Sequence, residues 1–310
     1  MGYKLSGFEV LGGVEIDPEM MAVYKANHNP KYSFLMGVQE FNKLPREKIP
    51  EDFFDLDILD GSPPCSSFSM AGSREKAWGK NKKFREGQSV QVLDDLFFHF
   101  IETARILQPK IVVAENVKGL VMGKAKGYVK QIAQMFNHAG YDVQLFLLNA
   151  AFMGVPQRRE RTFFIAKKKS LKWDKLDLKF DEKPVSIEQA LAGLGPQKGK
   201  ILTAETKLLW EKCKVGKSLA TVHAKGHRFI AIKVDPKNPC GTLLASADGN
   251  PIHWNEPRRF NKVENGRIQS FPDDYNYGKF EDNYICGMSV PPYMMNRISK
   301  QIQLQWLDKQ

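Results

Sequence analysis

Blocks of apolar and polar residues alternate over the first half of the chain, and their spacing switches between strand and helix periods. Apolar runs bounded by glycine, proline or charged residues are typical of buried strands, and they occupy 8–16, 54–59, 110–117, 141–148 and 162–166. Helical spacing occurs at 18–26, 94–107 and 128–137. This order predicts an α/β fold with a parallel, doubly wound sheet and right-handed crossovers.

The alternation stops after residue 168, where glycines interrupt a basic, irregular stretch with a few short strand-like runs such as 229–234. The predicted organisation is a catalytic and cofactor domain, a smaller domain of β and irregular structure, and a final part that ends in a helix returning to the first domain; the ranges are 1–168, 169–257 and 258–310. On that helix Met294, Ile298 and Ile302, with Leu304 or Gln305, lie near one side.

Positive charge is concentrated in the second part of the chain. The formal net charge is +11, and residues 167–233 hold 16 Lys and Arg against 7 Asp and Glu. Such asymmetry favours a polyanionic partner, because binding phosphates releases counterions. A lysine-rich solvated surface is the structural alternative, and charge balance does not decide between the two.

Other classes of protein fit this composition poorly. The chain lacks the run of about 18 apolar residues that spans a bilayer and a basic segment followed by an apolar one at its start, so we expect a cytoplasmic protein without a membrane partner. Its four cysteines, Cys65, Cys213, Cys240 and Cys286, are too widely spaced for a disulfide framework or a zinc site.

Cys65 follows the buried strand that ends near Asp60 and Gly61, in a turn made rigid by Pro63 and Pro64. Ligands of open α/β sheets bind at the carboxyl ends of strands, so a thiol at this position can act as a nucleophile once it is ionised. The alternative is a buried structural cysteine, the more common fate of a single Cys.

Two further stretches join Cys65 in a pattern. Glu115-Asn116-Val117 ends one predicted strand, and Gln157-Arg158-Arg159-Glu160-Arg161 begins another. A nucleophile, an acid and a cluster of guanidinium donors at neighbouring strands form a catalytic set. Pro64-Cys65, Glu115-Asn116-Val117 and Gln157-x-Arg159-x-Arg161, in this order, resemble the motifs of the DNA cytosine-5 methyltransferases of bacterial or phage type.

The resemblance implies a Rossmann-like methyltransferase sheet, a target-recognition domain in the middle of the chain, S-adenosylmethionine as methyl donor and double-stranded DNA as partner of a monomer. Its implied catalytic residues are Cys65, Glu115, Arg159 and Arg161. Residues implied to bind the cofactor are Glu15, Ile16, Val38, Asp60, Pro64 and Met288, and those implied to bind DNA are Ser66, Ser69, Gln157 and Arg158. For Glu15 a helix-start charge is the structural alternative.

Two positions depart from the family pattern, and both fall on the cofactor side. Val38 stands where an acidic residue usually contacts the adenine, and Met288 stands where the closing motif usually has asparagine. In nucleotide-binding units the ribose-binding acid follows a glycine-rich loop by about 20 residues, which places that loop before Met1. We therefore expect a gap at the middle of the sheet, where a first strand would lie, and weak binding of S-adenosylmethionine or none.

Several alternatives remain at this stage. The natural protein either begins further upstream, or it is a truncated relic. An RNA cytosine-5 methyltransferase and a catalytically impaired DNA-binding relic are the nearest functional rivals. A cysteine hydrolase is a third, although no histidine stands in a recognisable partner motif to activate Cys65.

Overall fold

The computed structural model describes residues 1–63, 81–82, 91–92, 95–122, 126–224, 226, 231–246 and 249–309. Pro64, Cys65, Ser66 and Ser69, which the sequence places in the site, lie outside the described residues. The structure describes the chain up to Pro63, the residue that precedes them.

The chain begins with a small parallel unit. Its elements are α1 (Gly2–Leu5), β1 (Gly12–Glu15), α2 (Pro18–His28), β2 (Tyr32–Leu35) and α3 (Val38–Phe41), followed by the 3-10 turns η1 (Arg46–Lys48) and η2 (Glu51–Phe54). The Asp17 side chain accepts hydrogen bonds from the amides of Glu19 and Met20 and so forms the N-cap of α2. β1 is shorter than the predicted strand at 8–16, because only Gly12–Glu15 pair with β2.

A four-stranded sheet forms the centre of the first domain. Its strands are β3 (Ile58–Gly61), β6 (Ile111–Val117), β8 (Glu160–Lys168) and β7 (Tyr141–Asn149), in the spatial order β3-β6-β8-β7. β3 and β6 are parallel, but β8 runs antiparallel to both of its neighbours. The prediction of a wholly parallel sheet is therefore wrong at this edge. Residues 150–159 are too short to carry a crossover helix, so the chain turns back as an antiparallel pair.

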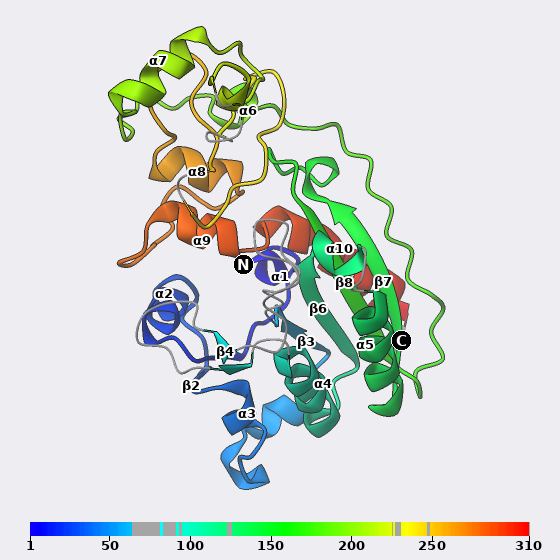
Figure 1. The fold of residues 1–310 in the computed structure, drawn as a ribbon. Coiled ribbons are helices and arrows are strands. Elements are labelled where there is room, and N and C mark those ends of the chain that lie inside the picture. The colour runs from blue at the N-terminus through cyan, green and yellow to red at the C-terminus, as the bar shows by residue number, and fades with distance from the viewer. Residues whose placement is uncertain are drawn as a thin grey trace.

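Helices cover both faces of this sheet (Figure 1). On one face α4 (Leu96–Leu107) and α5 (Lys126–His138) pack with Val112 and Ala114 of β6. On the other, α10 (Pro292–Gln305) packs with Ile111 and Val113 of the same strand. The alternation of buried residues along β6 places one set in each layer.

β1 and β2 form a separate two-stranded sheet. Val14 of β1 and Leu59 of β3 border one apolar cluster with Phe41 and Leu107, so the two sheets meet over a shared core. Among the described residues, no strand joins β1 to β3. A further short antiparallel pair, β4 (Asn81–Lys82) and β5 (Gln91–Val92), precedes α4.

The remaining elements belong mainly to the second part of the chain, and regular strands are replaced there by isolated bridges. The elements are η5 (Lys118–Val121), η7 (Ala150–Phe152), α6 (Ile187–Ala190), α7 (Ala204–Lys212), η8 (Leu219–Thr221), α8 (Lys262–Ile268), α9 (Asp282–Met288) and η9 (Leu307–Lys309). Single bridges join Ser218 to Ile232 and Ile252 to both Lys233 and Arg259. The predicted strand at 229–234 is thus reduced to two bridged residues in its described portion, since 229 and 230 lie outside it.

The helix α10 packs against the four-stranded sheet, and one position on it tests this packing. Ile298 is fully buried against the sheet, whereas Leu304 is 48% exposed. Ile298→Ala should lower the free energy of unfolding by about 2–5 kcal/mol, because it leaves a cavity in the core. Leu304→Ala on the same helix should change it by less than about 0.5 kcal/mol. Chemical denaturation of both variants measures the difference, and equal effects would contradict this packing.

Candidate active site

The predicted acid and one predicted arginine meet at the carboxyl end of β6. Glu115 lies opposite Phe163 of β8, so Arg161 is its diagonal neighbour on the same face. The Arg161 Nε lies 2.9 Å from Glu115 Oε1, and the two side chains are 14% and 12% exposed. Removal from water raises the pKa of Glu115, although Arg161, Arg159 and a hydrogen bond from Ser62 act in the opposite direction. The carboxyl is therefore easier to protonate than an exposed glutamate.

Asn116, the next residue along β6, binds the last described residue before Cys65. It is 4% exposed and its side-chain amide donates to the Pro63 carbonyl at 3.0 Å. Its Oδ1 accepts from the backbone N–H of Val117 at 2.9 Å. Gly61 of β3 packs directly against the Phe100 ring, because a Cβ at this position would lie 2.4 Å from it. In this motif Glu115 binds Arg161, and Asn116 binds Pro63.

Arg159 and Gln157 occupy an interior position. Arg159 is 1% exposed, and its guanidinium donates to the carbonyls of Leu243 at 3.1 Å and Gly287 at 2.7 Å. Gln157 is fully buried and donates to Gln269 Oε1 at 2.6 Å. Both side chains therefore contact the later part of the chain in this structure and reach no surface.

Arg158, which lies between these two residues, is exposed. Its guanidinium donates to Asn238 Oδ1 at 3.2 Å. Side chains of neighbouring residues in an extended segment point to opposite sides, which explains why Arg158 faces solvent while Gln157 and Arg159 do not. Of the predicted DNA-binding residues that the structure describes, Arg158 is thus accessible and Gln157 is enclosed.

The predicted cofactor residues gather partly at the carboxyl ends of β1 and β2. The Glu15 carboxylate accepts the Asp17 amide at 2.8 Å, and burial raises its pKa despite that bond. Ile16 borders Gly37, because a Cβ on Gly37 would lie 3.6 Å from Ile16 Cδ1. Val38 begins α3 and is half-buried. The Glu15 carboxylate and the apolar side chains of Ile16 and Val38 thus belong to the same strand ends. This combination suits a nucleoside whose ribose hydroxyls donate to the carboxylate.

Asp60 lies at the carboxyl end of β3 and keeps access to solvent. Surrounding protein nevertheless removes part of its hydration and raises its pKa to about 6, against the lowering effect of the Tyr3 hydroxyl that donates to it at 3.0 Å. The sequence reasoning missed Tyr3, since nothing in a helix-end residue signals a contact with position 60. Met288, the last residue of α9, is 46% exposed, next to the Gly287 carbonyl that Arg159 holds.

The basic stretch presents most of its lysines to solvent. Exposed members are Lys172, Lys175, Lys179, Lys183, Lys198, Lys200, Lys207, Lys212, Lys214 and Lys217. Lys233 differs, because it is 8% exposed and its Nζ lies 3.8 Å above the Trp210 ring. Lys233 therefore stabilises the second part of the chain internally and is not available to a phosphate in this structure.

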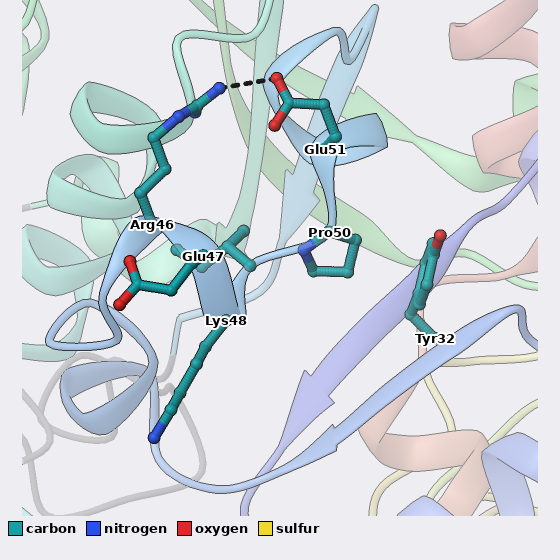
Figure 2. Close-up of a pocket in the computed structure, with 7 residues that line it drawn as sticks. Tyr32, Arg46, Glu47, Lys48, Pro50 and Glu51 are labelled. Carbon is teal, nitrogen blue, oxygen red and sulfur yellow. Dashed lines mark hydrogen bonds and ion pairs between the residues drawn. The ribbon is translucent and has the colours of Figure 1, made fainter.

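A hollow of about 660 Å³ lies at the opposite end of β2 (Figure 2). Tyr32, the first residue of β2, lines it together with Arg46, Glu47, Lys48 and Glu51. Arg46 is paired with Glu51 at 2.6 Å, so its charge is already neutralised. The hollow is remote from the carboxyl ends of the strands that carry Glu15 and Glu115, and we assign it no part in the site.

Two other classes of site find no support in the part of the chain that the structure describes. Across those ranges, no group of three or more His, Cys, Asp or Glu side chains is placed to hold a metal ion. Within the same residues, no helix combines the length and the apolar composition needed to cross a membrane. The described site consists of carboxylates, guanidinium groups and amides.

Comparison with known proteins adds a family match. The family model described as C-5 cytosine-specific DNA methylase matches residues 1–304. The Type II methyltransferase M.FnuDI of Fusobacterium nucleatum is 28% identical over 344 residues, covering 100% of this chain and 92% of the relative. The Type II methyltransferase M.DdeI of Desulfomicrobium norvegicum is 28% identical over 367 residues, covering 97% of this chain and 85% of the relative.

Solved structures share the fold. A protein described as a prophage-encoded DNA modification methyltransferase of E. coli aligns with a TM-score of 0.76 at 23% identity, covering 98% of this chain and 94% of that one. Spodoptera frugiperda DNMT2 aligns with a TM-score of 0.67 at 17% identity, covering 97% and 95%. At these identities the likeness concerns the fold.

Proposed function

Because this chain belongs to the C-5 cytosine-specific DNA methylase family, we propose that it transfers a methyl group from S-adenosylmethionine to C5 of a cytosine flipped out of double-stranded DNA, through a covalent adduct with Cys65. The observation that carries the proposal is the Glu115–Arg161 pair at 2.9 Å, beside Asn116, which holds Pro63 two positions before Cys65 in the sequence. An acid with a raised pKa and a guanidinium at neighbouring strand ends, together with a cysteine that follows β3 in the sequence, are the groups that the reaction requires.

The need for a nucleophile follows from the chemistry of cytosine. C5 carries too little electron density to attack a methyl group, and addition of the Cys65 thiolate to C6 makes C5 enamine-like. Negative charge then develops toward N3, where the protonated Glu115 carboxyl donates its proton. Arg161 is placed to orient that carboxyl and to donate to the base carbonyl. After C5 has bonded to the methyl group, water takes the C5 proton, the electrons of the C5–H bond expel the Cys65 sulfur from C6 as thiolate, and N3 returns its proton to Glu115.

The donor site rests on the residues at the ends of β1 and β2. S-adenosylmethionine supplies an electrophilic methyl group when bound. In this proposal Glu15 accepts the ribose hydroxyls, Ile16 and Val38 lie against the base, and Asp60 is a further acceptor at the end of β3. A stacked base pair would keep C5 and C6 out of reach of these groups, so the nucleotide has to leave the helix.

Label transfer tests the proposal. Tritiated S-adenosylmethionine is incubated with the protein and either mixed-sequence duplex DNA, the same DNA as single strands, or RNA, and the labelled base is identified by mass spectrometry. We expect 5-methylcytosine in the duplex. Label on RNA only, or on adenine, would contradict the assignment of substrate and reaction. Light scattering of the same sample checks the expected monomer.

Electrostatic contacts with the DNA backbone give a further prediction. Changing Lys198, Lys200, Lys212, Lys214 and Lys217 to Gln should reduce the slope of log K against log salt concentration by up to about 4, because each lost phosphate contact contributes about 0.9. Fluorescence anisotropy of labelled duplex at several salt concentrations measures the slope.

The matched control changes exposed lysines far from the basic stretch. Lys43 and Lys48 lie near α3, at the opposite end of the molecule from α7 (Figure 1). Their replacement by Gln should leave the slope unchanged. Equal effects of the two sets would show that the binding surface is not the stretch between residues 167 and 233.

A further inference from the structure

Two side chains that precede β8 hold one peptide segment from both sides. Gln157 Oε1 accepts the Leu243 amide at 3.1 Å, and Arg159 Nη1 donates to the Leu243 carbonyl at 3.1 Å. Backbone bonds extend the contact, since the Cys240 amide donates to Pro156 and its carbonyl accepts the Arg158 amide at 2.7 Å. We refer to the side chains of Gln157 and Arg159 around Leu243 as the Leu243 clamp.

The same two side chains also reach the helices that close the molecule. Gln157 Nε2 donates to Gln269 at the end of α8, and the Gln269 amide donates in turn to the Ser289 carbonyl at 2.8 Å. Arg159 Nη2 donates to the Gly287 carbonyl in α9 at 2.7 Å. Gln157 and Gln269 are fully buried, so each lost bond would leave an unpaired polar group. The network is therefore rigid as long as all members are present.

The clamp lies on the same stretch of chain as the catalytic pair. Residues 157, 159 and 161 are every second residue of an extended segment, so their side chains point to the same side. Of the three, Arg161 binds Glu115. Two residues of extended chain span about 7 Å, so any shift of residues 240–243 acts almost directly on the Glu115–Arg161 pair. Arg159 Nε, moreover, has no partner among the described residues.

We propose that Gln157 and Arg159 are positioning residues that hold residues 240–243, a part of the predicted target-recognition domain, in fixed register with the Glu115–Arg161 pair. Base recognition and methyl transfer are then coupled through one short segment. The coupling to methyl transfer rests on the proposed function, whereas the clamp itself is a mechanical link that can be measured without any substrate.

Amide hydrogen exchange tests the link directly. In Gln157→Leu the Leu243 amide loses its acceptor, and it should exchange at least about tenfold faster than in the unmodified protein, as expected for one hydrogen bond. Arg159→Lys, which keeps the charge but cannot reach both carbonyls, should speed exchange across 240–243 in the same way. It also serves if Gln157→Leu does not fold. Unchanged exchange in these variants would overturn the proposal.

The control replaces a different buried arginine, Arg258. Arg258 donates to Glu264 at 2.8 Å and its side chain is 4% exposed. Arg258→Lys should lower thermal stability, yet it should leave exchange at Leu243 and the choice of methylated sites unchanged at temperatures where the protein is folded. This comparison separates loss of the clamp from loss of stability.

Methylation of mixed-sequence DNA then measures the coupling. After sequencing the methylated sites, the clamp variants should show a kcat and a ratio of preferred to other sites that are each lower by about tenfold or more, with KM changed by less than about threefold. Clamp variants with the same site preference and the same kcat as the unmodified protein would overturn the coupling. Absence of methyl transfer by the unmodified protein would instead contradict the proposed function, and the exchange data would still decide whether the clamp exists.

Discussion

Replacing Cys65 by serine is expected to abolish methyl transfer and the covalent complex with DNA. A hydroxyl is far less ionised and less nucleophilic than a thiol at neutral pH, so the rate should fall by at least about 10³-fold. Duplex DNA carrying 5-fluorocytosine measures the covalent step, because C5 has no proton to release after methyl transfer and the adduct accumulates. Its mass shift on a denaturing gel should be present in the unmodified protein and missing in Cys65→Ser.

Cys213→Ser provides the matched control. Cys213 is buried in the second part of the chain, and its thiol lies 3.4 Å from the Lys217 carbonyl. A hydroxyl can make the same contact, so this variant should form the adduct at a normal rate. Binding of unmodified duplex should be nearly equal in all three proteins. An adduct that persists in Cys65→Ser would assign the nucleophile to another residue.

The second large effect is expected for Glu115→Gln. The amide cannot give a proton to N3, and it leaves Arg161 without its ionic partner, so kcat should fall by about 10²–10⁴-fold. Single-turnover kinetics with excess protein separates the chemical step from DNA binding, which should change little. Loss of the adduct with 5-fluorocytosine DNA should accompany the loss of rate, because charge at N3 is no longer relieved when sulfur adds to C6.

Glu182→Gln is the corresponding control. Glu182 forms an ion pair with Arg297 of α10, and both side chains are more than a third exposed. The same substitution therefore removes a carboxylate from an arginine outside the site, where the expected effect on stability is small. A normal kcat in Glu182→Gln and a normal kcat in Glu115→Gln together would show that Glu115 takes no part in proton transfer.

The local elements of the fold are predictable because each is encoded by neighbouring residues. The N-cap of α2 and the buried stripe of α10 follow from side chains within a few positions of each other. The direction of β8 does not, since a buried strand has the same apolar composition in a parallel or an antiparallel pair. Only the short connection at 150–159 indicates an antiparallel strand, because it is too short for a crossover helix. The alternation of strands and helices before it favours a parallel one.

Predictability of the site differs from residue to residue. Glu115 and Arg161 could be paired from sequence, because both belong to recognisable motifs at strand ends. The interior position of Gln157 and Arg159 could not, because their partners Leu243, Gln269 and Gly287 lie about 84 to 128 positions away along the chain. Polar residues in a catalytic motif suggest contact with substrate, and only the three-dimensional contacts distinguish that role from a buried one.

The contact between α1 and α10 has a consequence for synthesis on the ribosome. Gly2 has no room for a side chain because Met295 lies against it, and Ser6 donates to the Asn296 carbonyl 290 positions later. At about 5–20 residues per second, α1 leaves the exit tunnel roughly 15–60 s before its partner is translated. The side chains around Gly2 and Ser6 therefore lack their α10 partner while the intervening chain is made, and we expect this contact to form only after α10 is released.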